Sequence, residues 1–402
     1  MNKAINNIVK KNLCTGCAIC AEMFQQTIVE MKISPDGFLR PKAIRELSHS
    51  EVDLFNTVCP GSSISHLHRN NSFTPIWGPV KEVMTGHAAD DEVRHKGSSG
   101  GIVSALAIHL LETRQVHGVL HIVSSDQNPF ENVAQISYAR EDILRGAGSR
   151  YAPAAPLSRL SDCLNQEGMF AFIGKPCDVA ALRSLMRTHS EIEKKFPLLI
   201  AFMCAGTPNL NGTKEIIQEM GFDFLEVSNF RYRGNGWPGK ARAETIDGRS
   251  AEMDYDTSWG RILGRYVQFR CKICPDGTGE FADVSCADAW NTDEKGYPLF
   301  TENQGRSLII ARTDKGLSLI KEAQAHNKIL LDACSLTEAE KMQPYQVQRK
   351  RTLLARLIGF KLAFKTAPNY RNMGLFAAAK ESSFIKQLKA VVGSWLRGLK
   401  SS

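Results

Sequence analysis

Cysteine thiols are the side chains in this sequence whose spacing points most directly to chemistry. The first group lies near the N-terminus and reads Cys-Thr-Gly-Cys-Ala-Ile-Cys, a C-x2-C-x2-C run. Thiolates at this spacing turn around one centre, and three of them leave one position of a cubane iron–sulfur cluster for a remote cysteine that precedes a proline. Cys59-Pro60 supplies that pair. The spacing therefore predicts a [4Fe–4S] cluster held by Cys14, Cys17, Cys20 and Cys59.

A zinc knuckle is the alternative for this first group, since three cysteines and a remote fourth also suit tetrahedral zinc. The Cys-Pro pair favours iron and sulfide, and it makes the segment similar to one half of a two-cluster ferredoxin. A second C-x2-C pair, Cys271 and Cys274, lies far along the chain. By itself this pair is ambiguous between a redox dithiol, a zinc site and a cluster.

Composition favours metal or redox chemistry over disulfides for these thiols. The chain has 402 residues and eleven cysteines, with 43% hydrophobic and 23% charged residues. No run approaches the ~18 apolar residues of a membrane span, and the polar N-terminus lacks the apolar core of a secretory signal. We therefore expect a cytoplasmic protein, in which clustered cysteines bind metal or exchange electrons more often than they form disulfides.

The segments between the cysteines predict a mixed α/β fold. Short apolar runs at 119–124, 169–174 and 198–203 predict buried strands, and 102–112 and 179–187 predict helices. This alternation indicates an α/β core that begins near residue 80 and ends near residue 335. A small cysteine-bearing module and a polar, proline-containing linker at 70–79 precede the core, and a basic helical segment follows it.

Several short motifs occur in an order that is similar to one known family. They are Gly97-Ser98-Ser99-Gly100-Gly101, Gly148-Ser149-Arg150-Tyr151, Gly174-Lys175-Pro176-Cys177, the run from Phe230 to Gly239, the run from Cys271 to Gly279, and Ala287-Asp288-Ala289-Trp290. Over residues from about 10 to about 330 the chain resembles the beta-subunit family of coenzyme F420 hydrogenase/dehydrogenase, which includes the plant and cyanobacterial chlorophyll-cycle reductases such as 7-hydroxymethyl chlorophyll a reductase. With the resemblance, we expect a ferredoxin-like [4Fe–4S] module at 1–72, the family's N-terminal-type region at 78–155 and its C-terminal-type region at 156–335. The basic helical tail at 336–402 follows from composition and lies beyond the resemblance.

The same resemblance implies a flavin, usually FAD, close to a second [4Fe–4S] cluster. The family motifs assign Cys177, Cys271 and Cys274 to that cluster. The resemblance favours Cys204 as the fourth ligand, because members of the family usually carry a cysteine there. Cys286, which follows Cys274 by twelve residues, is the competing candidate.

The glycine- and serine-rich loop before the helix at 102–112 is the predicted flavin-binding segment. Glycines let backbone N–H groups approach an anion closely, and a helix N-terminus adds partial positive charge. The alternative is an ordinary helix start capped by a serine. Lys175 either stabilises an anionic reduced flavin or is solvated, and Trp237 is either a wall against a bound ring or a core residue. With the resemblance, the predicted cofactor contacts are Ser98, Ser99, Gly100, Gly101, Ser149, Arg150, Tyr151, Lys175, Asn235 and Trp237.

These expectations describe an oxidoreductase in which the cofactors carry the chemistry, and no side chain is predicted to be catalytic. Electrons would pass between a small-molecule redox substrate, F420-like or another, then FAD and two [4Fe–4S] clusters, and then ferredoxin or another electron-transfer protein. One alternative is a ferredoxin-dependent reductase of a pigment or of a polysaccharide-pathway substrate. Another is a non-catalytic electron-transfer subunit.

Positive charge is concentrated in the C-terminal segment. Residues 349–402 contain twelve Lys or Arg and one acidic residue, a net charge of +11 in a chain whose total is +8. The apolar residues of 384–399 fall on one face of a predicted helix. This helix either docks on the body by its apolar face or lies on a membrane surface, at the inner face of the membrane. No nucleic-acid partner is expected, because no binding fold for nucleic acid accompanies the charge.

Overall fold

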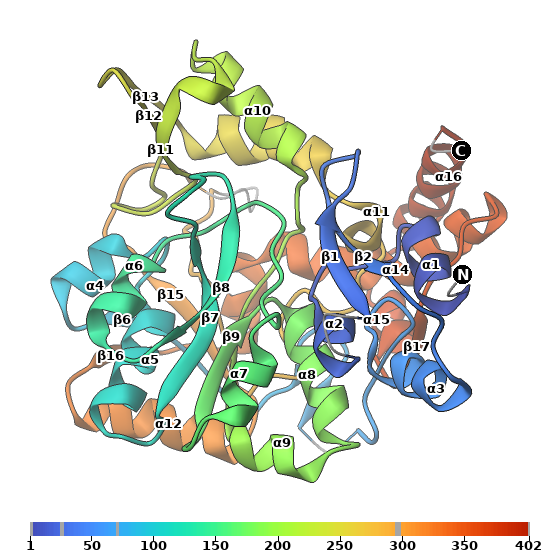
Figure 1. The fold of residues 1–402 in the computed structure, drawn as a ribbon, viewed down its shortest axis with the longest axis horizontal. Helices are drawn as coiled ribbons and strands as arrows, with labels where there is room; N and C mark the ends of the chain where they lie inside the picture. The colour runs from blue at the N-terminus through green and yellow to red at the C-terminus, as the bar shows by residue number, and fades with distance from the viewer. Residues whose placement is uncertain (1–2, 25–27, 70–71, 294–298, 401–402) are drawn as a thin grey trace.

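A large mixed sheet forms the centre of the computed structural model, which describes residues 3–24, 28–69, 72–293 and 299–400 (Figure 1). In spatial order its strands are β16 (Ile329–Ala333), β6 (Glu82–Ala88), β15 (Ser307–Ala311), β14 (Val284–Asp288), β10 (Leu198–Phe202), β9 (Phe170–Gly174), β7 (Gly118–Ser124) and β8 (Asn132–Ser137). The central strands β14, β10, β9 and β7 run parallel to one another. Antiparallel strands extend the sheet on both sides.

Helices cover both faces of this sheet, which is why its inner strands are apolar on both sides. Every residue of β9 and of β15 is buried. One core packs α5 (Ile102–Glu112) and α12 (Asp314–Ala325) against the sheet, and another packs α8 (Pro176–Met186) against it. The shorter helices around the sheet are α4 (Asp91–Lys96), α6 (Arg140–Arg145), α7 (Leu160–Asn165) and α9 (Ser190–Lys195).

The N-terminal module has a core of its own. Its elements are α1 (Lys3–Lys10), α2 (Ile19–Met23), the antiparallel strands β1 (Val29–Ile33) and β2 (Leu39–Ala43), α3 (His49–Val58) and β3 (Ser63–Ser65). A capping box of Ser48 and Glu51 begins α3, and the helix ends at Val58. Cys59 therefore follows directly on the helix and joins Cys20 in the core of the module.

A separate three-stranded antiparallel sheet lies beside the main sheet. It consists of β11 (Val227–Arg231), β12 (Ala241–Thr245) and β13 (Ser250–Met253). Ile216 and Ile217 of α10 (Leu210–Glu219) pack into its core. The helical turns that accompany it are η1 (Phe224–Glu226), η2 (Asp256–Ile262), η3 (Leu263–Tyr266) and α11 (Phe269–Lys272).

The C-terminal segment is built into the body. Its elements are α13 (Leu336–Met342), α14 (Pro344–Leu362), β17 (Asn369–Arg371), α15 (Leu375–Lys380) and α16 (Phe384–Lys400). β17 pairs in parallel with β3 of the N-terminal module. Arg349 and Lys350 of α14 are buried. Two of the twelve basic residues of 349–402 are therefore buried in the interior.

The structure confirms the mixed α/β core and the elements predicted for it. α5 spans the predicted helix 102–112, and β7, β9 and β10 lie where apolar runs predicted strands. The segment 72–79 differs from a free linker, because β4 (Phe73–Thr74) pairs with β5 (Gly78–Pro79) and Trp77 between them is buried. Asn70 and Asn71 of the predicted linker lie outside the described residues.

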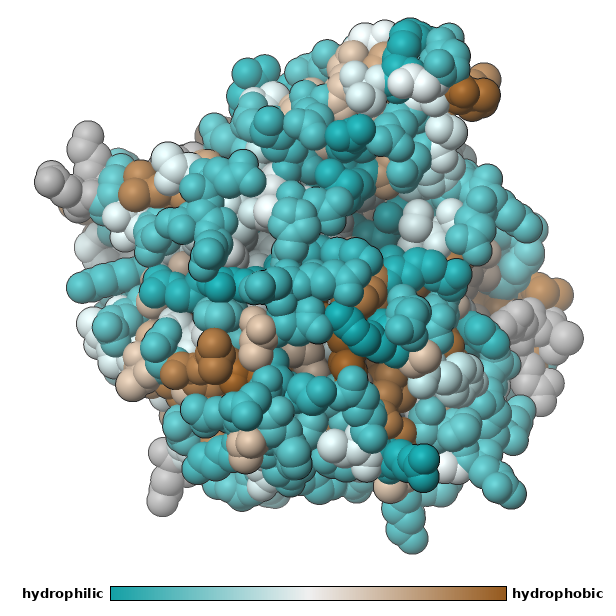
Figure 2. Space-filling view, turned by 90° about the vertical axis from the view of Figure 1, so that its left-hand side faces the viewer, coloured by the Kyte–Doolittle hydropathy of each residue, from teal (hydrophilic) through white to brown (hydrophobic). Residues whose placement is uncertain are grey.

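Two further observations describe the exterior. Within the described ranges, no helix combines the length and the apolar character that crossing a membrane requires. The face on the side of α4 and α6 is covered mainly by hydrophilic side chains, with small apolar patches between them (Figure 2).

Candidate functional site

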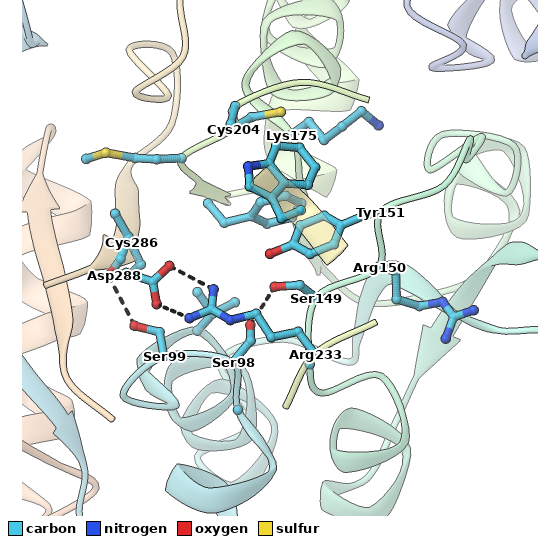
Figure 3. A pocket seen from close by; sticks show the side chains of 18 of the residues that line it. Ser98, Ser99, Ser149, Arg150, Tyr151, Lys175, Cys204, Arg233, Cys286 and Asp288 are labelled. Carbon is cyan, nitrogen blue, oxygen red and sulfur yellow. Dashed lines mark hydrogen bonds and ion pairs between the residues drawn. The ribbon is translucent and has the colours of Figure 1, made fainter. Parts of the chain in front are cut away.

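A cavity of about 990 Å³ opens at the carboxyl ends of the parallel strands β9, β10 and β14 (Figure 3). Lys175 follows β9, Met203 follows β10, and Asp288 ends β14, and all three line it. Ligands of parallel α/β sheets bind outside the carboxyl ends of the strands. The cavity also has the size of a cofactor site. The fold thus places a large binding site where the sequence motifs converge.

The predicted glycine- and serine-rich loop forms part of the cavity wall. The hydroxyl oxygens of Ser98 and Ser149 lie 2.6 Å apart, and both residues line the cavity. Ser99 turns toward the sheet, where its hydroxyl donates to the carbonyl oxygen of Ala287 at 3.2 Å. Of the two predicted loop serines, Ser98 therefore has the hydroxyl that faces the cavity with Ser149, while Ser99 anchors the loop.

The first turn of α5 has no side-chain cap. Gly101 occupies the N-cap position with φ +74°, so the serine cap considered from the sequence does not form. A Cβ at Gly101 would lie 2.7 Å from the carbonyl oxygen of Val93, and one at Gly100 would lie equally close to that of Gly86. Gly100 itself is not among the residues that line the cavity. The uncapped N–H groups and partial positive charge of the helix belong to three lining residues, namely Ile102, Val103 and Ser104.

Arg150 and Tyr151 point in different directions. The guanidinium of Arg150 turns away from the cavity and donates to Asn132 and to the carbonyl oxygen of Pro129 (Figure 3). Burial lowers the pKa of Arg150. Tyr151 points into the cavity and packs on Trp259, with ring centroids 4.6 Å apart. Arg150 therefore fixes the backbone at the cavity edge, and Tyr151 supplies an inner surface.

Arg233, which is not among the predicted cofactor contacts, lies in the cavity wall (Figure 3). Its buried guanidinium forms a bidentate ion pair with Asp288, with N–O distances of 2.9 and 2.8 Å. Burial alone would lower the pKa of Arg233, but Asp288, Tyr151 and Tyr255 together outweigh burial and raise it. Both residues lie within the family motifs, so a signal existed. Their pairing across 55 positions could not be derived from the motifs.

Trp237 and Asn235 lie behind the cavity wall and not in it. The indole N–H of Trp237 donates to Asp288 at 2.8 Å, and its ring stacks on Trp290 at 4.9 Å between centroids. Trp290 and Tyr255 are the aromatic residues that line the cavity here. Asn235 takes a left-handed backbone conformation with φ 54°. Trp237 therefore acts on the site through Trp290 and Asp288.

The thiols predicted for the first cluster are buried together in the N-terminal module: Cys14, Cys17, Cys20 and Cys59. Burial and the three other thiols raise the pKa of Cys20 well above its ordinary value. Burial also raises the pKa of Cys59, with contributions from Cys17 and Cys14. Left-handed backbone at Gly16 and Ala18, with φ values of 81° and 68°, turns the short run back on itself.

Four more thiols meet beside the cavity: Cys177, Cys204, Cys271 and Cys274. Burial, Asp178 and the thiols of Cys204 and Cys274 raise the pKa of Cys177. Burial and then Cys271 raise the pKa of Cys204 to about 12. Cys204 also lines the cavity. Cys204 thus belongs both to this set of four thiols and to the cavity wall.

Cys286, the competing candidate, lies differently. It sits on β14 and lines the cavity. Burial is the one cause that raises its pKa to about 12, and no other thiol contributes. The structure therefore groups Cys204, and not Cys286, with the three other inner thiols. Across residues 3–24, 28–69, 72–293 and 299–400, no group of three or more His, Cys, Asp or Glu side chains is placed to hold a single metal ion.

Two buried arginines stand among the inner thiols. Burial opposes the charge of Arg270, but Tyr370 and the nearby thiols outweigh it and raise its pKa. Cys274 and other neighbours likewise outweigh burial and raise the pKa of Arg349. Among the described residues, Nη1 of Arg270 and Nη2 of Arg349 have no hydrogen-bond partner. Arg270 also donates to the carbonyl oxygen of Pro60 at 2.9 Å, which ties it to the N-terminal module.

Lys175 is held by an ion pair and is not solvated. Its Nζ lies 2.7 Å from Oδ2 of Asp178, and its side chain is 11% exposed. The pair forms at the start of α8, which places Cys177 between its two members. Lys175 lines the cavity, so its charge faces both the cavity and the inner thiols.

A hydrogen-bonded bridge connects the outer set of four thiols with the inner set. Arg40 donates to the carbonyl oxygen of Cys14 at 3.2 Å and to the side-chain carbonyl of Gln268 at 3.1 Å. The amide of Gln268 donates in turn to the sulfur of Cys271 at 3.4 Å. No motif of the sequence predicted Arg40 or Gln268.

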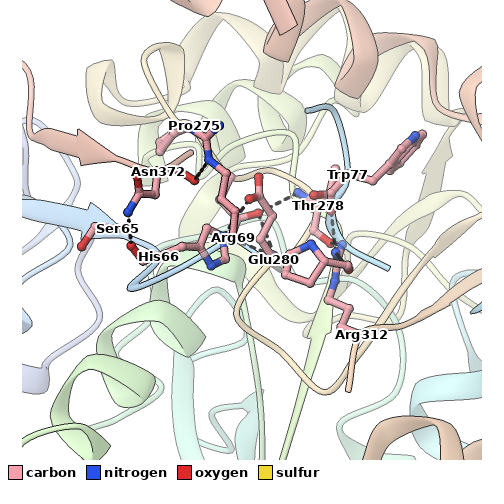
Figure 4. A network of polar contacts seen from close by, with 12 residues as sticks. Ser65, His66, Arg69, Trp77, Pro275, Thr278, Glu280, Arg312 and Asn372 are labelled. Atoms are coloured by element: carbon pink, nitrogen blue, oxygen red, sulfur yellow. Dashed lines mark hydrogen bonds and ion pairs between the residues drawn. The ribbon is translucent and has the colours of Figure 1, made fainter. Parts of the chain in front are cut away.

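A buried polar network fixes the loop that follows Cys274 (Figure 4). Glu280 accepts a hydrogen bond from Lys350 and lies 2.9 Å from Nε2 of His66. Lys350 also donates to the carbonyl oxygen of Pro275 at 2.8 Å. The side chain of Glu280 is fully buried. A helix from the C-terminal segment therefore holds the inner cysteine loop in position.

Comparison with known proteins identifies the family. Residues 83–161 match the model for the N-terminal part of the coenzyme F420 hydrogenase/dehydrogenase beta subunit, and residues 168–336 match the model for its C terminus. The chain belongs to this family. The matched ranges include all four inner thiols and most of the residues that line the cavity, whose remaining lining residues, Met342 to Gln346, follow the second range.

The relatives in this beta-subunit family are oxidoreductases. The chain is 24% identical, over 98% of its length, to the coenzyme F420-dependent sulfite reductase of Methanocaldococcus jannaschii, and it spans 58% of that protein. It is 27% identical to the coenzyme F420 hydrogenase subunit beta of Methanococcus voltae, over 61% of this chain and 82% of the relative. A chain of the F420-reducing [NiFe] hydrogenase complex from Methanosarcina barkeri has a similar fold, with a TM-score of 0.54 and 20% identity over 71% of this chain and 94% of that chain.

Proposed function

We propose that this chain is an iron–sulfur flavoprotein oxidoreductase that relays electrons between a small-molecule substrate and a protein partner. FAD would occupy the cavity, one [4Fe–4S] cluster would be held by Cys177, Cys204, Cys271 and Cys274, and a second by Cys14, Cys17, Cys20 and Cys59. The observation that carries the proposal is the position of Cys204, which lies among the inner thiols and also lines the cavity. A cluster on these thiols would border the bound flavin.

The surroundings of the inner thiols suit an anionic metal cluster. Burial raises the pKa of Cys177 and of Cys204, so these two thiols stay protonated unless a bound metal centre offsets their charge. The unpartnered guanidinium nitrogens of Arg270 and Arg349 are costly in a buried site unless they meet an acceptor. Thiolate and sulfide are such acceptors, and hydrogen bonds to cluster sulfur also set reduction potentials. A cubane takes one thiolate for each of its four irons, which matches four cysteines per site.

The cavity suits a flavin for similar reasons. The uncapped start of α5 presents N–H groups and partial positive charge, which favour a diphosphate. Tyr151, Tyr255 and Trp290 offer aromatic surfaces for a flat ring. Ser98 and Ser149 add two hydroxyl groups to the cavity lining. The donors and the apolar surfaces are therefore arranged for a ligand with an anionic end and a ring.

The side chains of the site have separable tasks in this mechanism. When bound, a flavin exchanges two electrons with a small molecule and single electrons with iron–sulfur clusters. Lys175 holds positive charge beside the cavity, and Asp178 fixes its position. Arg233 and Asp288 hold the aromatic wall through Trp237 and Trp290. The bridge of Arg40 and Gln268 fixes the outer thiols relative to the inner ones.

The partners follow from this chemistry and from the relatives. The names of several relatives carry coenzyme F420, which supports an F420-like two-electron donor or acceptor for this chain. Some relatives are named as subunits, which supports ferredoxin or another electron-transfer protein as the one-electron partner. The cavity favours a chain with its own small-molecule substrate over a non-catalytic electron-transfer subunit.

Anaerobic purification and reconstitution test this function. We expect about eight iron and eight sulfide per chain from two clusters, together with about one flavin. Replacing Cys17 with Ala should lower the iron to about four and leave the flavin bound. Zinc in place of iron, or a chain that retains no flavin, would contradict the proposal.

A further inference from the structure

Helix α16 presents three different faces. Its packed face carries small or short side chains and rests on α14, where Ser394 is fully buried. A Cβ at Gly359 of α14 would lie 2.2 Å from the carbonyl oxygen of Val391, which shows how closely the two helices approach. Gly398 is also buried, against Ala363 of α14's C-terminal end. The helix is therefore docked on the body, but not by its large apolar residues.

Those large apolar residues point outward. At about 100° per residue they fall within roughly one third of the helix circumference. Their exposed fractions run from 40% to 80%. The outward stripe consists of Phe384, Ile385, Leu388, Val392, Trp395, Leu396 and Leu399. An exposed apolar stripe of this length marks an interaction surface.

The third face is basic. Lys386, Lys389 and Arg397 are exposed beside the stripe, and the helix contains no acidic residue. The opposite side of the molecule, seen in Figure 2, is mainly hydrophilic. Apolar and basic surfaces are thus joined along one edge of the protein, at the rim next to α1 and α14 (Figure 1).

We propose that α16 binds the surface of an anionic lipid bilayer, with the stripe in the interface and the basic face against the headgroups. Charge complementarity selects this occupant, because a basic face without acids attracts anionic lipid along its whole length. A tryptophan on the apolar side and a strongly divided helix are typical of helices that lie in the interfacial plane. The packed small-residue face holds the helix on the body while the stripe inserts. This inference is independent of the proposed redox function.

Sedimentation with vesicles tests the proposal on the full chain. We expect binding to phosphatidylglycerol vesicles at low salt, weak binding to phosphatidylcholine vesicles, and weaker binding as salt rises. The double variant Leu388→Gln/Leu396→Gln should weaken binding to anionic vesicles by roughly tenfold or more, because it removes apolar area from the interface. The double variant Lys386→Gln/Lys389→Gln should bind anionic vesicles more weakly than the parent, and this binding should depend less on salt.

A matched control uses two exposed apolar residues far from the helix. Leu225 and Ile246 are 85% and 78% exposed, and Leu225→Gln/Ile246→Gln should leave vesicle binding unchanged. Iron and flavin content, measured on every variant, should stay at the parent value. No binding of the parent chain to anionic vesicles at low salt overturns the proposal. Self-association through the stripe would also overturn it. In that case the parent chain forms a dimer and does not bind vesicles, and the Leu388→Gln/Leu396→Gln variant is a monomer.

Discussion

The side-chain amide of Gln268 donates a hydrogen bond to the sulfur of Cys271 across 3.4 Å. The other end of the same amide accepts from Arg40, which also holds the backbone of Cys14. One side chain therefore touches a predicted ligand of the inner cluster and is positioned by the outer module. If the thiols carry clusters, Gln268 is placed to set the potential of the inner one.

Replacing Gln268 with Leu should lower the reduction potential of the inner cluster. The hydrogen bond stabilises the more negative, reduced state, and a bond of about 0.5–1.5 kcal/mol corresponds to roughly 20–60 mV for one electron. A redox titration followed by electron paramagnetic resonance measures the shift. Gln324→Leu, on the surface of α12, is the control and should leave the potential unchanged. Equal reduction potentials in the Gln268→Leu variant and the parent would show that Gln268 does not set the potential of the inner cluster.

Cys204 and Cys286 should differ when each is replaced with Ala. Cys204 lies among the inner thiols, so its loss should remove about four of eight irons and disturb the flavin beside it. Cys286 lines the cavity and no thiol contributes to its raised pKa, so its loss should keep all the iron. Iron and flavin analysis of reconstituted protein decides. Loss of iron from Cys286→Ala alone would reverse the assignment.

Gly277→Ala should damage the inner site without touching a cysteine. Its Cβ would lie 1.3 Å from Nη2 of Arg349, so the guanidinium must leave its place beside the thiols. We expect overpacking to cost about 1–3 kcal/mol of stability, together with poorer retention of the inner cluster. Chemical unfolding and iron analysis measure both effects. Gly264→Ala, with its nearest neighbour at 3.4 Å, is the matched control, and equal behaviour of the two variants would contradict the packing argument.

His121 should make the apoprotein sensitive to mild acid. Burial lowers its pKa from 6.5 to about 4, and its Nε2 lies 2.7 Å from the hydroxyl of Ser137. Between these pH values the unfolded chain binds a proton that the folded chain excludes, so stability falls as pH falls. The loss from pH 7 to pH 5 should be about 2 kcal/mol.

Urea unfolding at both pH values measures this dependence. His121→Gln should be less sensitive to pH than the parent by that amount, whereas His68→Gln, at an exposed position, should keep the parent's dependence. A His121→Gln variant with the parent's full pH dependence would assign the effect to other groups.

Local sequence patterns predicted the helices and strands of the core. They did not predict the contacts between residues that are far apart in the sequence. The apolar run of β9 and the helix α5 follow from hydrophobic patterning, because each buries its own residues against the sheet. The ion pair of Arg233 with Asp288 joins two motifs through the fold alone. Composition places Arg349 in a basic tail, yet in the structure α14 holds it beside the inner thiols. Hydrophobic patterning predicts where a helix forms, but it does not predict which charged residue the fold brings beside a distant set of thiols.

The helix at the C-terminus shows the same limit. Its amphipathic period predicts a helix that either docks by its large apolar face or lies on a membrane surface. The structure docks it by a face that includes Ser394 and Gly398, because small residues allow the close approach to α14. Which face of α16 docks depends on the shape of α14, and the sequence of α16 alone gives no information about that shape.

Anaerobic coulometric titration tests the central claim most directly, because it counts the electrons that the chain holds. One flavin takes two electrons and each of two [4Fe–4S] clusters takes one, so the reconstituted chain should take about four. The flavin band should bleach during the same titration in which the reduced clusters become visible by electron paramagnetic resonance. A chain that takes about two electrons with no cluster signal, or none at all, would contradict the account.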